Sequence, residues 1–240
     1  MIFDKKNRLF EKIFSSYNKR LLGRHFRRIH IEGEKSFLER NTSKPTILFG
    51  NHSNWWDGLV IFYLSYNRWK TDTYVMMEEK QMKKYKFFSK IGAFSVDRES
   101  ARNALKSISY SIGLLKNSGK ILLMFPQGEM LPNDKRPIVF ENGIGRIIKE
   151  LKSVNVFPVC FRYEFLKEQL PEVFIKIGNR VTITNTDIKS ITSDLRDILE
   201  YELNELKDKI INNELTDFEI ILKGKKSGSE LIDELKFTKA

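Results

Sequence analysis

Short apolar segments alternate with helix-like segments along most of this 240-residue chain. Each apolar segment has the length of a buried strand, and apolar residues recur every three or four positions between them. The expected strands are residues 46–50, 73–77, 93–97, 121–125, 155–161, 172–177 and 180–184. The last two could form a hairpin that turns at Gly178-Asn179. This alternation predicts an α/β fold, a mixed, largely parallel sheet flanked by helices.

Helices are expected in the intervening segments, at residues 55–66, 78–90, 100–119, 143–151 and 193–211. Ser100 has the side chain of a helix N-cap, and Gly119 is expected to end the same helix. The C-terminal residues beyond Gly224 are expected to be loose. No internal repeat or linker divides the chain, so one domain is the simplest organisation.

The N-terminal segment is basic and amphipathic. The whole chain has a formal net charge of +11, and residues 1–30 contain nine Lys/Arg against two acidic residues. Large apolar residues recur there at helical spacing: Phe3, Phe10, Ile13, Phe14, Tyr17 and Leu21. This pattern is typical of a helix in a membrane interface. The alternative is a helix that packs the apolar stripe on its own domain.

A second Lys-rich segment, residues 80–90, interleaves five lysines with Met82, Tyr85, Phe87 and Phe88. It could touch an anionic membrane or pack on the sheet with its lysines in solvent. We therefore divide the chain into a membrane-surface arm (1–35), a main domain (36–215) and a C-terminal tail (216–240). No apolar run approaches the roughly 18 residues that span a bilayer, which favours a peripheral protein on the cytoplasmic face of the cell membrane.

The composition excludes several classes of site. One cysteine permits no disulfide framework or Cys-rich metal site, and with three histidines we expect no metal centre. Cys160 lies in an apolar strand and is expected to be buried, whereas His25 and His30 are expected at the surface. The positive charge gathers in one helix and no nucleic-acid-binding motif is present, so no nucleic-acid partner is expected.

The strongest candidate for chemistry is His52, which follows an expected buried strand directly. Sites in α/β folds gather at the carboxyl ends of strands. Asp57 can reach His52 if the histidine lies in the loop and the aspartate in the first helical turn, with Asn54 as N-cap. A histidine oriented by a carboxylate is a general base. The alternative is a capping aspartate beside an ordinary loop histidine.

Three more segments carry polar or special residues at strand ends. Gly92 to Arg98 brings a guanidinium, which suits phosphate or carboxylate, to the end of a strand. The sequence Phe125-Pro-Gln-Gly-Glu129 follows another strand. Pro158 interrupts a further strand-like run, which suggests an edge or a bend.

Taken in order, these segments resemble four blocks of the glycerol-phosphate and lysophosphatidic acid acyltransferase family, over roughly residues 44–185. The family's blocks are Asn-His with an Asp five residues after the His, a Gly-to-Arg strand, Phe-Pro-Glu-Gly-Thr-Arg, and a hydrophobic-Pro-hydrophobic strand. The first and fourth match well. In the second, Gly92 and Arg98 are present and the aromatic Phe94 stands one place early.

The resemblance implies an O-acyltransferase that moves a fatty acyl group to the hydroxyl of a lipid acceptor. His52 would be the general base and Asp57 its orienting partner. Arg98 would contact the acceptor's head group, and Gln127, Gly128 and Glu129 would line the same pocket. No cofactor is implied. Acyl-CoA or acyl-carrier protein would be the co-substrate, and both are anionic, as the basic surface favours.

The third block departs from the family pattern. Gln127, Glu129 and Met130 stand where the family has Glu, Thr and Arg. The lost Arg would normally help to hold a phosphate, so an aminolipid or a larger hydrophobic alcohol becomes a candidate acceptor beside lysophosphatidic acid. Lys135 and Arg136 are candidate substitutes for the lost guanidinium. The functional alternative is a noncatalytic membrane-surface adaptor that retains the fold.

Overall fold

The computed structural model describes residues 1–226 and 228. Within them, one mixed sheet has the strand order β4-β3-β5-β2-β6-β7-β1-β8. The strands are β1 (Arg28–Glu32), β2 (Thr46–Gly50), β3 (Thr73–Glu78), β4 (Ala93–Val96), β5 (Ile121–Met124), β6 (Asn155–Glu164), β7 (Glu172–Ile177) and β8 (Glu219–Lys223). The five from β4 to β6 are parallel, β7 is antiparallel to β6, and β8 is antiparallel to β1.

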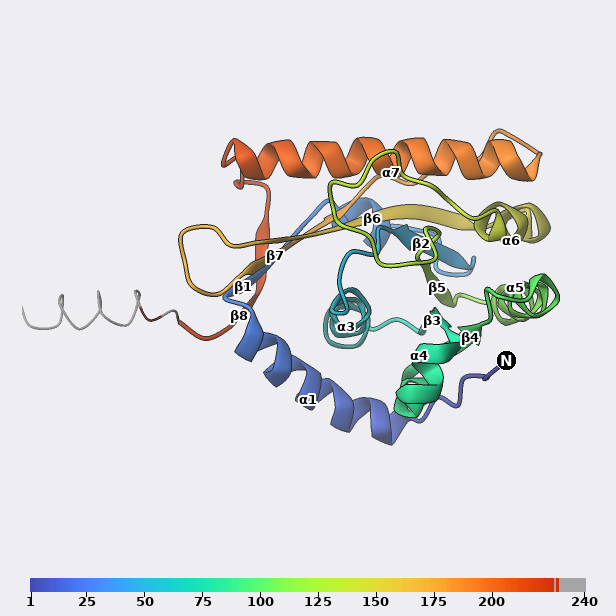
Figure 1. Ribbon diagram of the computed structural model, residues 1–240, viewed down its shortest axis with the longest axis horizontal. Coiled ribbons are helices and arrows are strands. Elements are labelled where there is room, and N and C mark those ends of the chain that lie inside the picture. The colour runs from blue at the N-terminus through green and yellow to red at the C-terminus, as the bar shows by residue number, and fades with distance from the viewer. Residues whose placement is uncertain (227, 229–240) are drawn as a thin grey trace, which may run out of the picture.

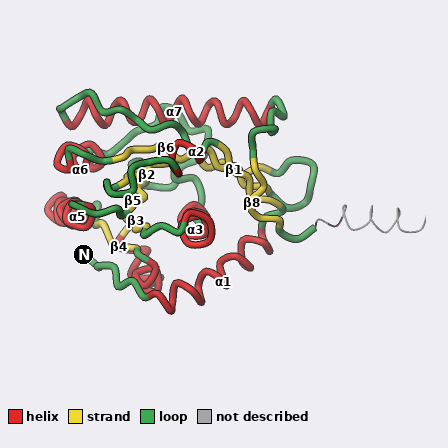
Figure 2. The backbone as a smooth tube through the Cα atoms, turned by 180° about the vertical axis from the view of Figure 1, so that it is seen from behind, coloured by secondary structure: helices red, strands yellow, loops and turns green. Residues whose placement is uncertain are grey.

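Helices cover both faces of this sheet (Figures 1 and 2). They are α1 (Arg8–His25), α2 (Glu34–Leu38), α3 (Asp57–Tyr63), the π-helical η1 (Leu64–Trp69), α4 (Glu79–Lys84), the 3-10 helix η2 (Lys86–Ile91), α5 (Ala101–Leu115), α6 (Gly143–Leu151) and α7 (Ile188–Ile211). Side chains alternate along each strand. In β2, Phe49 faces α5, α6 and α7, while Leu48 faces α3. The predicted α/β fold is thus confirmed.

Two strands were not anticipated from the sequence. β1 lies within the basic N-terminal segment, and β8 lies within the expected C-terminal tail. Their pairing extends the sheet beyond β7. His30, on β1, was expected at the surface, and this was wrong. Its ring is 5% exposed, stacks on Phe174 and bonds to Glu172.

The predicted hairpin at residues 172–184 was also wrong. β7 forms as expected, but residues 178–186 form no strand. Both edges of β7 are occupied, by β6 and β1, so no position beside it remains for another strand. Neither Gly178 nor Asn179 has the positive φ that a tight hairpin turn needs. The segment leads instead to α7, which begins earlier than expected because Asp187 caps it.

Helix α1 divides its apolar residues between two faces. Phe14 and Leu22 are buried, and Phe14 packs against Phe62 and Phe87. Ile13 and Tyr17, in contrast, are 62% and 56% exposed. Half of the expected membrane-facing stripe therefore packs on the protein itself.

The Lys-rich segment behaves similarly. It forms α4 and η2, whose Met82 and Phe88 are buried against the inner face of α1. Packing on the domain therefore accounts for these apolar side chains. Among the described residues, no helix combines the length and the apolar character that crossing a bilayer requires.

Candidate active site

The candidate site lies at the edge of the sheet where several parallel strands end. β2, β5, β3 and β4 are neighbours and run in the same direction, so their carboxyl ends meet there. His52 follows β2, residues 126–128 follow β5, and Arg98 follows β4. Residues far apart in the sequence are thus brought to one edge.

His52 and Asp57 are in hydrogen-bond contact, with 2.8 Å between Nδ1 and Oδ2. His52 lies in the loop after β2, and Asp57 is the first residue of α3. This is the arrangement that their spacing required. Asn54 is not the N-cap, however: Trp56 precedes the helix, and the Asp57 side chain itself accepts the backbone N–H groups of Ser53 and Asn54, both at 2.9 Å.

Asp57 is fully buried and accepts a fourth hydrogen bond, from the Tyr163 hydroxyl at 2.6 Å. Burial, with the adjacent Asp57 carboxylate, raises the pKa of Tyr163 well above its ordinary value. The tyrosine therefore stays protonated and donates to Asp57. Acceptance of four hydrogen bonds is the chemistry of a carboxylate, which leaves the His52 Nδ1 as a donor and Nε2 as the basic nitrogen.

The loop that carries His52 is anchored at several points. The Asn51 side chain pairs with the backbone of Phe161 on β6, through bonds of 2.9 and 2.8 Å. The backbone N–H of His52 donates to Gln127 Oε1 at 2.9 Å, and its ring stacks on Phe125 at 4.3 Å between centroids. These contacts fix the imidazole relative to β5 and β6.

Arg98 and Gly128 lie together, as their predicted shared pocket requires. Arg98 Nη1 donates to the Gly128 carbonyl at 2.5 Å. Gly128 has φ of +75°, and a Cβ there would lie 2.8 Å from Arg98 Cζ, so a side chain would strain the backbone and displace the guanidinium. Arg98 also lies 3.9 Å from the exposed carboxylate of Glu141.

The remaining predicted residues lie in different positions. Gln127 is buried beneath the loop, and its side chain holds the His52 backbone. Glu129 and Met130 are exposed and line the cavity described below. Arg136 does not replace the missing guanidinium, because it binds Asn204 on α7 and nearby carbonyls. Lys135 does not line the cavity either.

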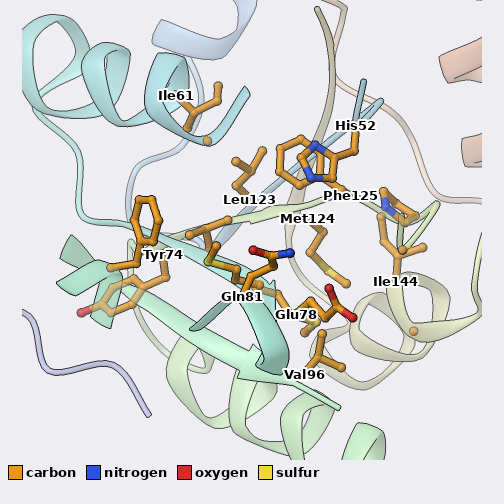
Figure 3. A pocket seen from close by; sticks show the side chains of 18 of the residues that line it. His52, Ile61, Tyr74, Glu78, Gln81, Val96, Leu123, Met124, Phe125 and Ile144 are labelled. Atoms are coloured by element: carbon orange, nitrogen blue, oxygen red, sulfur yellow. The ribbon is translucent and has the colours of Figure 1, made fainter. Parts of the chain in front are cut away.

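A cavity of about 870 Å³ opens beside His52. Figure 3 shows His52 and Phe125 at one end and Tyr74 at another, with Ile61, Leu123 and Met124 between them. Trp55 lines it, while Trp56 packs partly buried between α1 and the sheet. The cavity is large and mostly apolar, as binding sites for small molecules are.

Comparison with known proteins identifies the family. A family model described as Acyltransferase matches residues 28–162, more than half of the chain. This chain belongs to the acyltransferase family. Over 161 residues it is also 27% identical to the 1-acyl-sn-glycerol-3-phosphate acyltransferase of Streptococcus pneumoniae (strain ATCC BAA-255 / R6). That match covers 64% of this chain and 56% of the relative, so it spans just over half of the relative's length.

The structure adds site residues that sequence reasoning missed. Tyr163 was unremarkable in the sequence, and its role depends on β6 passing beside α3. Asn51 belongs to the Asn-His block, but sequence reasoning assigned it no function. In the structure its side chain ties the His52 loop to β6. Glu78 ends β3 and lines the cavity, a position that its place after an expected strand could have suggested. In the described part of the chain, no three His, Cys, Asp or Glu side chains group as metal ligands do.

Proposed function

We propose that this protein is an O-acyltransferase that moves a fatty acyl group from a thioester donor to the hydroxyl of a lipid acceptor. The observation that carries the proposal is the 2.8 Å contact between His52 Nδ1 and Asp57 at the mouth of an apolar cavity. His52 is the general base and Asp57 orients it. The relative's name supports a glycerolipid acceptor.

The reaction moves the acyl group from a thioester to a hydroxyl, which becomes an oxygen ester. His52 Nε2 takes the proton from the acceptor hydroxyl as its oxygen attacks the thioester carbonyl. The carbon–sulfur bond then breaks, and the imidazolium returns the proton to the departing thiolate. Asp57 holds the ring in the required tautomer and stabilises its charged form. This sequence consumes one hydroxyl and one thioester and yields an ester and a thiol.

The cavity provides room for the apolar part of the substrates. Leu59, Phe62 and Met76 are among its apolar lining residues. Burying a fatty chain there is favourable by about 0.8 kcal/mol for each methylene removed from water. Acyl-CoA and acyl-carrier protein both present such a chain on a thioester, so either is a suitable donor. Arg98 and Gly128 line the same cavity as His52, which supports their contact with the acceptor's head group.

We further propose that the outer face of α1 binds an anionic membrane surface at the cytoplasmic face. Leu9, Ile13 and Tyr17 form an exposed apolar stripe at a spacing of four residues. Cations flank it: Arg8, Lys12, Lys19, Arg20 and Arg24 are all exposed. An apolar stripe bordered by Lys and Arg suits a helix that lies in the interface. Such a position would bring the site close to its lipid acceptor.

The direct experiment incubates the purified protein with a membrane lipid extract and a labelled acyl donor, and identifies the product by mass spectrometry. Labelled lipid that is absent with His52→Ala supports the enzyme. The alternative is an adaptor that binds lipid without turnover. It would be supported if the wild-type protein bound vesicles but formed no labelled ester with acyl-CoA or acyl-carrier protein.

A further inference from the structure

Among the described residues, two polar side chains of the cavity wall make neither a hydrogen bond nor an ion pair. Glu78 and Gln81 both point into the cavity, on the side that also holds Val96 (Figure 3). Glu78 is the last residue of β3, and Gln81 is on α4. Within residues 1–226 and 228, neither side chain makes a hydrogen bond or an ion pair. The ion pairs of Lys80 and Lys83 are with Glu99 and Glu79, and Lys80 acts on Glu78 only through its more distant charge.

The half-buried Glu78 carboxylate faces the cavity, and no protein hydrogen-bond donor among the described residues uses its acceptor capacity. Such a group is retained where a ligand supplies the missing partner. The partner of a carboxylate is a cation or a hydrogen-bond donor. Gln81 adds a carbonyl acceptor and an amide donor beside it.

The charges around the cavity favour a cation as well. Its lining has five carboxylates and three Lys/Arg side chains, although the chain as a whole has a net charge of +11. Arg98, the cation expected to hold a phosphate, already donates to the Gly128 carbonyl and faces Glu141. Position 130 is methionine and position 129 is glutamate. A phosphate monoester dianion would thus meet more negative than positive groups.

We propose that the acceptor lipid carries an ammonium group and that Glu78 binds it. This specificity rests on the proposed acyl transfer at His52. Only β5 lies between β3 and β2. The end of β3, where Glu78 lies, is therefore two strand spacings, about 10 Å, from β2, the strand that His52 follows. That separation suits a head group with several bonds between the reacting hydroxyl and its nitrogen. Glu78 is a specificity-determining residue rather than a part of the proton relay.

The ammonium could come from a phosphoethanolamine head group or from an amino-acid head group without phosphate. The test measures kcat/KM with a labelled acyl donor and four monoacyl acceptors of equal chain length. These are lysophosphatidylethanolamine, a monoacyl amino-acid lipid, lysophosphatidic acid and uncharged monoacylglycerol. We expect the wild-type protein to favour at least one ammonium acceptor over lysophosphatidic acid by tenfold or more. The better of the two ammonium acceptors identifies the source.

Three substitutions sharpen the test. Glu78→Gln should raise KM for the preferred ammonium acceptor about tenfold. Its kcat/KM for monoacylglycerol should change little, and this would show that the fold and the proton relay are intact. Glu78→Lys should reverse the order in favour of lysophosphatidic acid. Glu150→Gln, on the exposed face of α6 outside the cavity, is the matched control. It should leave kcat/KM unchanged for both the ammonium acceptor and monoacylglycerol.

A wild-type preference for lysophosphatidic acid, or an acceptor order that Glu78→Gln leaves unchanged, would overturn the role of Glu78 while leaving acyl transfer intact. Absence of transfer to every acceptor would instead reject the proposed function, and the acceptor proposal would fall with it. The two failures are therefore distinguished by whether any labelled ester forms.

Discussion

The Tyr163 hydroxyl donates a 2.6 Å hydrogen bond to the carboxylate of Asp57, which in turn holds His52. Tyr163 comes from β6 and Asp57 from the start of α3, so this bond joins the sheet to the loop that carries the imidazole. Burial and the nearby carboxylate raise the pKa of Tyr163, so its proton is retained over the working pH range. The orientation of His52 thus depends on a residue more than a hundred positions away.

Replacing Tyr163 by Phe should lower kcat about tenfold and leave KM for both substrates nearly unchanged. The reason is that Asp57 loses one charge-assisted hydrogen bond and holds the imidazole less firmly. Steady-state kinetics with the labelled donor check this, and Tyr201→Phe, at a surface tyrosine that is 66% exposed, is the matched control. A rise in KM with kcat intact would mean that Tyr163 contacts substrate instead.

Replacing Asp57 by Asn should cost about a thousandfold or more in kcat, because the amide no longer selects the histidine tautomer that leaves Nε2 basic. An amide nitrogen would also face the N–H groups of Ser53 and Asn54. Thermal unfolding of the variant separates the loss of rate from loss of fold. Near-normal turnover in a folded Asp57→Asn protein would show that Asp57 does not orient the base.

Membrane binding by the outer face of α1 should respond to charge placed in its apolar stripe. Ile13→Glu combined with Tyr17→Glu should reduce co-sedimentation with anionic vesicles about tenfold or more, and raised salt should weaken the wild-type binding. Ile211→Glu, at a 66% exposed apolar position on α7, is the control. Equal sedimentation of the wild type, the double variant and the control would contradict membrane binding by the outer face of α1. Deleting residues 1–30 is a poorer test, since it also removes most of β1.

The buried cluster of Arg27, His30 and Glu172 predicts a pH-dependent stability. Burial would raise the pKa of Glu172, but hydrogen bonds from His30 and Arg27 outweigh it and lower that pKa. A pKa lowered on folding stabilises the protein above the ordinary glutamate value of about 4.3, and this stabilisation is lost as pH falls through the folded value.

Glu172→Gln should therefore lower the free energy of unfolding by about 3 kcal/mol at pH 7, where two basic groups lose a buried partner. The difference from wild type should shrink below about pH 4. Denaturant unfolding at several pH values measures it, with exposed Glu214→Gln as the control. A difference that stays constant down to pH 3 would show that the charge of Glu172 is not the cause.

The central part of the fold could be predicted from the sequence because its strands are continuous apolar runs. β2 and β5 are buried between two helical layers, so their residues are mostly apolar on both faces. β1 and β8 lack that signal. β1 carries Arg28, His30 and Glu32, and the partners of His30 and Glu32 come from β7 and α7. β8 is mostly exposed at the edge. Their place is decided by tertiary pairing.

The candidate site shows the same division. The spacing of His52 and Asp57 allowed their contact if His52 lay in the loop and Asp57 in the first helical turn, and both do lie in one strand–loop–helix unit. Tyr163 and Glu78 could not be assigned in the same way, because their positions depend on which strands neighbour β2 in the sheet. The apolar stripe of α1 was ambiguous for a related reason: helical periodicity finds an apolar surface but does not say what covers it.

Acyl transfer by the His52→Ala protein is the most direct measurement of the central claim. The account predicts that the variant forms no labelled ester above the uncatalysed rate, while its circular dichroism, thermal unfolding and vesicle binding match those of the wild-type protein. Turnover of His52→Ala close to the wild-type rate would contradict the account, because the acceptor hydroxyl would then lose its proton to some other group.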